Sequence, residues 1–178
     1  MAVNKKGKKE KVIEVLNKAR GMELYAVHQY MNQHYSLDDK DYGELAAKMK
    51  LIAIDEMKHA ENFAERIKEL GGEPTTQKEG AVKTGQSVQA IYEADSAQEE
   101  ATIETYSQFR KICHEQGDTI TARLFERIIG EEQVHLTYYE NTSSHIKTLG
   151  DTYLAKIAGT PSNTGPSKGF ATVNNANG

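Results

Sequence analysis

Apolar residues recur at steps of three and four along four long segments of the chain, which is the period of an amphipathic α-helix. The four segments span about 10–35, 41–70, 87–116 and 118–149, the third starting anywhere between 87 and 96, and each has one apolar stripe. A shorter helix is expected over 151–157. With only three prolines and no tryptophan, the chain is predicted to be all-α rather than a sandwich of short strands.

The connections between these helices predict how they pack. The stretch 36–40 and Gly117 are short turns, which place successive helices side by side and antiparallel. Gly71 begins a long connection, 71–86, which is poor in apolar residues and can cross the bundle from end to end. This order predicts a ferritin-like four-helix bundle with one long crossover and a short fifth helix, in a single domain over 1–158.

Composition narrows the class of protein. The 178 residues are 38% hydrophobic and 27% charged, with a net charge of −4, which gives no support to nucleic-acid binding. No apolar run approaches the length of a membrane span, and no apolar stretch follows the basic N-terminus, so a soluble, cytoplasmic protein is expected. The lone Cys113 excludes a disulfide framework. Residues 159–178, rich in Gly, Ser, Thr and Asn, are expected to form a flexible tail.

Each predicted helix carries one glutamate near the middle of its apolar stripe. In the second and fourth helices a histidine follows three residues later, on the same helical face, so each Glu-x-x-His pair points two donors into the bundle. The two glutamates of the first helical hairpin are 33 residues apart, as are those of the second. The six residues are Glu23, Glu56, His59, Glu99, Glu132 and His135.

Four glutamates are costly to bury unless cations accompany them. Two divalent ions balance four carboxylate charges, and oxygen with imidazole ligation suits iron or manganese. Glu99 is preferred to Glu100 because only Glu99 is in phase with Tyr106, and Glu132 is preferred to Glu131 because only Glu132 has the histidine at the right spacing. One Glu-x-x-His is a weak signal, and surface salt bridges are the alternative, but two matched pairs on buried stripes favour a two-metal site.

With these residues the chain resembles the bacterioferritins, within the ferritin-like superfamily, over about residues 8–157. In that family the matching residues hold a di-iron ferroxidase centre. The resemblance implies that Glu23 and Glu99 are terminal ligands, that Glu56 and Glu132 bridge the irons, and that His59 and His135 each bind one iron. It rests on the segments Leu16-Asn17-Lys18, Glu23-Leu24, His28-Gln29-Tyr30, Asp55-Glu56-Met57-Lys58-His59-Ala60-Glu61, Glu65-Arg66-Ile67 and Glu131-Glu132-Gln133-Val134-His135.

Two further residues gain a role from the resemblance. Met57 is rotated about 100° from Glu56 on the helix, away from the metal-facing stripe. Alone it is explained as an ordinary subunit-contact methionine, whereas the family resemblance implies an axial ligand of a haem shared between two subunits across a two-fold axis. Tyr30, seven residues after Glu23, is similar to the family's tyrosine beside the di-iron centre, although a core tyrosine hydrogen-bonded to a carboxylate fits equally well.

The resemblance implies an iron-storage protein that oxidises Fe(II) with O2 or H2O2. It would deposit ferric mineral inside a haem-containing shell of 24 subunits, with the fifth helix at the four-fold axes and a ferredoxin or rubredoxin as a possible electron donor. The alternative is a non-storage di-iron peroxide or O2 reductase of the rubrerythrin kind, although no second cysteine is present for a rubredoxin module. A metal-free assembly protein would need basic residues facing the glutamates, and a DNA-coating mini-ferritin would place its site between subunits.

Four smaller expectations can be checked in a structure. Leu51 stands where some bacterioferritins have a histidine for an extra inner-surface iron, so that site is not expected. Gly130 lies inside a helix at a cost of about 1 kcal/mol relative to alanine, which indicates a packing or geometric reason. His28 and His34 are expected at a surface or interface, and Cys113 in the core.

Overall fold

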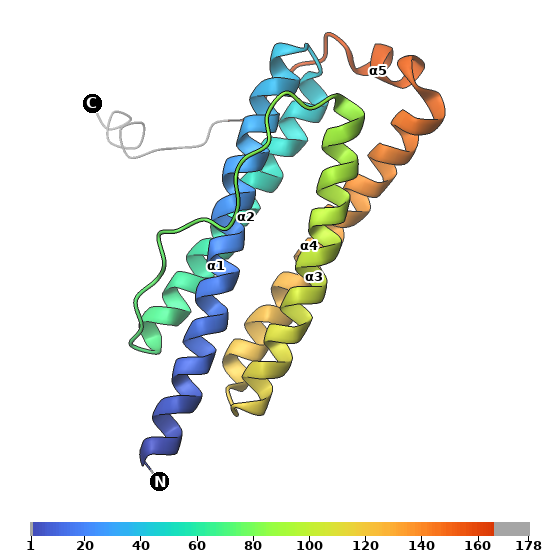
Figure 1. Ribbon diagram of the computed structural model, residues 1–178. Helices are drawn as coiled ribbons and strands as arrows, with labels where there is room; N and C mark the ends of the chain where they lie inside the picture. The colour runs from blue at the N-terminus through green and yellow to red at the C-terminus, as the bar shows by residue number, and fades with distance from the viewer. Residues whose placement is uncertain (1, 166–178) are drawn as a thin grey trace, which may run out of the picture.

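A computed structural model describes residues 2–165, which form an elongated bundle of helices (Figure 1). One hairpin pairs α1 with α2 and the other pairs α3 with α4, while α5 lies at the end of the bundle where α4 ends. Within residues 2–165 the only β pairing is an isolated bridge, and none of the helices is long and apolar enough to cross a membrane. The all-α prediction is confirmed. The helices are α1 (Ala2–Asp39), α2 (Gly43–Glu69), α3 (Val88–Glu115), α4 (Thr119–Leu149) and α5 (Asp151–Ile157).

The segment 71–86 is the long crossover that the sequence predicts. It runs along the outside of α1 from the end of α2 to the opposite end of the bundle, where α3 begins (Figure 1). Its backbone is tied to α1, because the amide of Glu79 donates to the carbonyl of Gly21 at 2.9 Å. A Cβ at Gly21 would lie 3.0 Å from Glu79 Cγ, so glycine allows the crossover this close approach. The result is two antiparallel hairpins in the order of a ferritin-like bundle.

Local sequence signals account for the helix ends. Gly71 has φ +75° after the last turn of α2, and its amide donates to the carbonyl of Lys68 at 2.8 Å. The side chain of Ser87 caps α3 by accepting from the amide of Ala90 at 3.2 Å. Asp118 caps α4 in the same way by accepting from the amide of Thr121 at 2.9 Å. These caps fix the points at which the helices begin and end, and so help to keep the six predicted ligands at one level of the bundle.

The first helix is longer than the expected span of 10–35. It begins at Ala2, because Lys and Glu are good helix formers and the early turns need no apolar partner; residues 8–10 are exposed. It also continues through the predicted turn at 36–40, since the side chain of Leu37 is fully buried in the core. The chain reverses instead around Asp41, which has φ +63°.

The core consists of two hydrophobic clusters, one on each side of a layer of buried charged residues. The first cluster lies towards α5 and includes Leu37, Met49 and Ile146. The second lies towards the free end of the α3–α4 hairpin and includes Phe63 and Cys113, whose predicted burial is confirmed. The six predicted ligands lie between the two clusters, where apolar packing shields them from solvent.

The chain after α5 is fixed to the turn between α1 and α2. Gly159 donates from its amide to the carbonyl of Asp41 at 2.9 Å, and the hydroxyl of Thr160 accepts from the amide of Glu44 at 2.8 Å. A Cβ at Gly43 would lie 1.8 Å from the carbonyl oxygen of Thr160, so this contact requires glycine. The predicted tail therefore begins with defined contacts, and its residues 166–178 lie outside the described part of the chain.

One of the smaller expectations finds no support within the described part of this chain, and another is wrong. Gly130 is exposed, and nothing lies within 4 Å of the position that a Cβ would occupy, so nothing in the described residues requires a glycine there. His34 is buried rather than at the surface, with Nδ1 2.8 Å from the carbonyl oxygen of Ala46. It is buried because α1 continues beyond it to Asp39, so the returning helix α2 packs against it at Ala46. His28 is exposed, as expected.

Candidate metal centre

The structure brings the six predicted metal-ligating residues together in the middle of the bundle, one glutamate from each of α1 to α4 and a histidine from α2 and α4. All six are buried, with exposed fractions between 0% and 6%. They form two groups that share Glu56 and Glu132, and the donor atoms of each group lie within 4.8 Å of one another. One group is Glu23, Glu56, His59 and Glu132, and the other is Glu56, Glu99, Glu132 and His135.

Each histidine directs one ring nitrogen at both shared carboxylates. Nδ1 of His59 lies 3.0 Å from Oε2 of Glu56 and 3.2 Å from Oε1 of Glu132. Nδ1 of His135 lies 3.1 Å from Oε2 of Glu132 and 3.1 Å from Oε1 of Glu56. A ring nitrogen carries one proton or one lone pair, so it satisfies one of these oxygens at most. This is the convergence of donor atoms that a shared pair of cations produces.

Two buried oxygens of the shared carboxylates have no hydrogen-bond donor. They are Oε1 of Glu56 and Oε1 of Glu132, which face histidine nitrogens at ion-pair distance without the direction of a hydrogen bond. A buried acceptor without a partner costs about 1–3 kcal/mol, and more when it is charged. Divalent cations would satisfy both oxygens, and the mixture of carboxylate and imidazole donors suits iron or manganese. The residues present therefore fit a two-metal site.

Without cations, protons balance the charge of the centre. Burial and the neighbouring carboxylates raise the pKa of Glu23 and of Glu99 well above the usual value. Burial lowers the pKa of each histidine, but contacts with Glu132 and Glu56 outweigh it and raise the pKa of His59 to about 12 and that of His135 to about 11. Cations that bind the centre must displace these protons, because only deprotonated groups are ligands.

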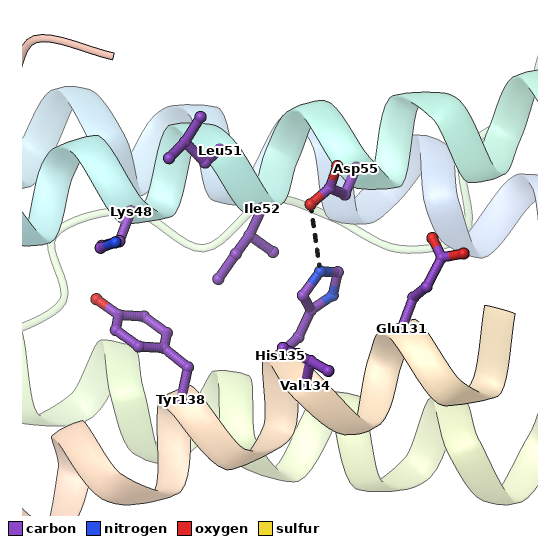
Figure 2. Close-up of a pocket in the computed structure, with 8 residues that line it drawn as sticks. All are labelled: Lys48, Leu51, Ile52, Asp55, Glu131, Val134, His135 and Tyr138. Atoms are coloured by element: carbon purple, nitrogen blue, oxygen red, sulfur yellow. Dashed lines mark ion pairs between the residues drawn. The ribbon is translucent and has the colours of Figure 1, made fainter.

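The second ring nitrogen of each histidine faces a carboxylate outside the centre. Nε2 of His59 lies 2.9 Å from Glu131, which Arg127 contacts at 2.8 Å. Nε2 of His135 lies 3.7 Å from Asp55, the ion pair drawn in Figure 2. Such contacts fix the ring so that Nδ1 points at the metal position. The sequence reasoning weighed Glu131 only against Glu132 and missed this role; the signal was that each outer carboxylate directly precedes a shared glutamate.

Two tyrosines hold the remaining carboxylates. The hydroxyl of Tyr30 donates to Oε1 of Glu99 at 2.5 Å, and the hydroxyl of Tyr106 donates to Oε1 of Glu23 at 2.5 Å. Each tyrosine therefore reaches the glutamate on the other helix rather than the one on its own. Tyr106 was missed as a site residue, although it follows Glu99 by seven positions just as Tyr30 follows Glu23.

The two hairpins repeat the whole site at a constant separation of 76 positions along the chain. Glutamates, histidines, tyrosines and outer carboxylates all obey this offset, so the centre has an internal pseudo-two-fold arrangement. The pairs are Glu23 and Glu99, Tyr30 and Tyr106, Asp55 and Glu131, Glu56 and Glu132, and His59 and His135.

One half of the centre lies beside a surface cavity of about 450 Å³ between α2 and α4. Figure 2 shows His135 and Tyr138 facing Ile52, Asp55 and Lys48 across it. The cavity gives a small ion a route towards the Nε2 side of His135. Leu51 also lines it.

Met57 lies apart from the six residues. It is on α2 but 55% exposed, whereas its neighbour Glu56 is buried in the centre. The structure therefore places its thioether on the outside of the subunit, as the rotation from Glu56 predicts.

Antiparallel hairpins joined by a long crossover, with one glutamate from each helix at the centre, define a ferritin-like bundle. A sequence profile of the Ferritin family, described as a ferritin-like domain, matches residues 13–149. The chain belongs to the bacterioferritins. It is 79% identical over 174 residues to the bacterioferritin of Desulfovibrio desulfuricans, covering 97% of each chain.

Solved structures agree with this assignment. An X-ray structure of the Desulfovibrio desulfuricans bacterioferritin, described as showing its diiron site in different catalytic states, matches with a TM-score of 0.92 and 80% identity, covering 93% of this chain and 98% of that one. The bacterioferritin BfrA of Mycobacterium tuberculosis matches with a TM-score of 0.79 and 33% identity, covering 83% of this chain and 93% of that one.

Proposed function

We propose that this chain stores and detoxifies iron, and that its buried centre is a ferroxidase site which oxidises Fe(II) to Fe(III) with O2 or H2O2. The observation that carries the proposal is the set of six buried donors converging within one chain, two of them shared. The 79% identity to a bacterioferritin over almost the full length favours storage over the rubrerythrin-like reductase.

The two overlapping donor groups suggest a role for each residue. Glu23 and His59 serve one iron, Glu99 and His135 serve the other, and the carboxylates of Glu56 and Glu132 bridge the two. When bound, two ferrous ions supply one electron each to the oxidant. The protein need supply no nucleophile, so its task is to position ligands and manage protons.

The surrounding residues carry out that task. The hydroxyls of Tyr30 and Tyr106 each occupy one oxygen of a terminal carboxylate and leave the other free to face the metal. Asp55 and Glu131 hold the outer nitrogens of the histidines. The apolar clusters on both sides exclude bulk water, which strengthens every electrostatic contact in the centre.

Met57 is proposed as the axial ligand of a haem shared with a second copy of the chain. Its thioether is exposed on the outer face of α2, and a two-fold interface would supply the same residue twice, so the two methionines would hold the haem iron between them. Such a haem would carry electrons to stored iron. Met57→Leu should abolish the haem absorption band, while Met22→Leu, a half-buried methionine of the second core cluster, should keep it.

The assembly is proposed to be a cytoplasmic shell of 24 subunits with α5 at the four-fold axes, reduced by a donor such as a ferredoxin or rubredoxin. Light scattering should then give a mass near 24 times that of the 19.8 kDa chain.

The central experiment is an anaerobic Fe(II) titration of metal-free protein followed by addition of O2. Rapid oxidation should saturate at about two Fe per chain, and slower mineral growth should then reach hundreds per assembly. Oxidation that stops at two Fe per chain would favour the reductase, and protein that binds no iron would overturn the proposal.

A further inference from the structure

A second hydrogen bond joins α1 and α3 one turn away from the metal centre. Nε2 of Gln33 donates to Oδ1 of Asp95 at 3.0 Å, and both side chains are buried, with 2% and 3% exposed. Gln33 follows Tyr30 by three residues and Asp95 precedes Glu99 by four. The Gln33–Asp95 and Tyr30–Glu99 hydrogen bonds are therefore adjacent rungs between two antiparallel helices.

The outer rung is incomplete. Oδ2 of Asp95 and Oε1 of Gln33 have no hydrogen-bond partner, and both residues line a small cavity of about 30 Å³. One water needs about 10–15 Å³ of such volume and can donate to two acceptors. Two buried acceptors without a donor, in a space of this size, are the surroundings of one bound water.

The crossover forms the roof of this cavity. The side chain of Gln29 accepts from the amide of Lys83 at 2.7 Å and donates to its carbonyl at 3.0 Å, which fixes the crossover over the cavity. Gln86 accepts from Gln33 at 3.3 Å beneath it. Lys83 itself is exposed, so a single layer of chain separates the cavity from solvent.

The other half of the centre has no such pocket. Applying the 76-residue offset, Asp95 corresponds to Ala19 and Gln33 corresponds to Phe109. Ala19 is fully buried in the second core cluster and Phe109 packs against that cluster. The bundle can therefore close around a metal centre with apolar residues at these two positions, so packing alone does not explain the polar pair.

Asp95 is poised to exchange a proton near neutral pH. Burial raises its pKa to about 7, although the hydrogen bond from Gln33 and the charge of Lys83 oppose the shift. The tyrosines that face Asp95 have raised pKa values and stay neutral in this range. The titratable groups that face it are Tyr25 and Tyr30 from α1, Lys83 from the crossover, Tyr92 from α3 and Tyr139 from α4.

We propose that Asp95, with one water between its Oδ2 and Oε1 of Gln33, passes protons between the Glu99 half of the metal centre and solvent beneath the crossover. The proposal rests on the proposed function, because protons leave the centre when cations take their place on the ligands. Glu99, one helical turn further along α3, loses its proton when a cation takes the proton's place. Oδ2 of the Asp95 carboxylate accepts this proton, the resulting O–H donates it to the water, and the water releases it on the Lys83 side. Asp95 returns to a carboxylate, and no electron moves.

Asp95→Asn tests this role, because asparagine keeps the shape and the hydrogen bond but cannot carry the proton. Assembled metal-free protein is mixed with Zn²⁺ in weak buffer, and a pH indicator records proton release by stopped flow. The wild-type rate should rise with pH through about 7. The variant should be about tenfold slower and show no such rise. Gln33→Leu should slow release but keep the rise, and Glu93→Gln, which neutralises an exposed carboxylate on the same helix, should match wild type.

Two further readouts separate failure of this inference from failure of the proposed function. A carbon-13 NMR titration of metal-free protein should show one aspartate carboxyl titrating near 7 that is absent from Asp95→Asn. Titration of Asp95 in the range of an exposed aspartate, or equal release rates in variant and wild type, would overturn the inference. Failure of wild-type protein to bind two Zn²⁺ per chain would instead overturn the proposed centre. The NMR titration would still show whether Asp95 exchanges a proton near neutral pH.

Discussion

The hydroxyl of Tyr106 on α3 donates a 2.5 Å hydrogen bond to Oε1 of Glu23 on α1. Both groups are buried, so the contact is made away from competing water. It fixes Oε1 of Glu23, the oxygen that also lies 3.8 Å from Nδ1 of His59, and makes no contact with the second oxygen. The tyrosine therefore orients a candidate terminal ligand from the opposite helical hairpin, and its contact couples the packing of the two hairpins to the geometry of the centre.

Removing this hydroxyl should weaken one metal position more than the other. Tyr106→Phe leaves Glu23 without its partner, and loss of such an outer contact typically costs about 10- to 100-fold in metal affinity. Anaerobic titration with Co²⁺, followed by its visible absorption, should show one weakened ion per chain in Tyr106→Phe. Tyr30→Phe should weaken the other ion by the same mechanism.

Tyr139→Phe is the matched control for this pair of variants. Its hydroxyl donates to the sulfur of Met49 at 3.4 Å rather than to a carboxylate, and it is equally buried. It should bind Co²⁺ as wild type does. Equal weakening in all three variants would show that loss of core packing, rather than ligand orientation, is responsible.

The shared and terminal carboxylates should differ in metal stoichiometry. Glu56→Gln or Glu132→Gln removes a donor common to both groups, so Zn²⁺ binding should fall from two ions per chain towards none. Glu23→Gln or Glu99→Gln removes a donor from one group only, and one ion per chain should remain. Equilibrium dialysis with metal analysis distinguishes the two outcomes.

Glu131→Gln is the control for these changes. It lies beside Glu132 and contacts the outer nitrogen of His59, but belongs to neither donor group. It should keep two ions with reduced affinity. Loss of both ions from Glu23→Gln would show that the two positions fill only together and would contradict independent terminal ligands.

The spacing of apolar residues along each helix explains which parts of the site could be predicted from the sequence. A stripe of apolar residues shows which face of a helix is buried, so a glutamate on that stripe is visible as an anomaly, and the candidate ligand set follows from Glu56, His59 and their counterparts. The spacing of apolar residues in one helix does not show which residue of another helix a side chain will contact. For that reason Tyr30 was expected near the centre without a partner, and its bond to Glu99 rather than Glu23 needed the structure. The polar pair Gln33 and Asp95 was missed for the same reason.

Gly130 offers a test of stability away from the site. It lies in an exposed position of α4 with open space where a side chain would begin. Alanine is favoured over glycine inside a helix by about 1 kcal/mol, so Gly130→Ala should raise the free energy of unfolding by that amount. Thermal melting should show the gain in isolated subunits. A loss of assembly in the variant, with stable subunits, would identify the glycine as a subunit contact.

The protonation of the centre predicts that the stability of metal-free protein depends on pH, whereas that of metal-loaded protein does not. The pKa values of His59 and His135 are raised above 6.5, so the stability that they contribute is full below 6.5 and is lost as pH rises towards 11 and 12. The raised pKa values of Glu23 and Glu99 act in the same direction, their contribution being lost as pH rises above 4.5. The lowered pKa of Glu132 matters only in acid, where its contribution is lost as pH falls below 4.5.

Metal-free protein should therefore melt at a lower temperature as pH rises from about 7 to about 9.5, by at least about 3 °C, which is the change that about 1 kcal/mol produces in a chain of this size. Zn²⁺-loaded protein should not show this fall, because its ligands are already deprotonated and neutralised by the ions. Differential scanning calorimetry of both forms measures the difference. The double variant His59→Gln and His135→Gln should flatten the metal-free response, since it removes two groups that stay protonated in the folded chain and lose their protons on unfolding in this range. An equal fall in the loaded and metal-free forms would place the titrating groups outside the centre.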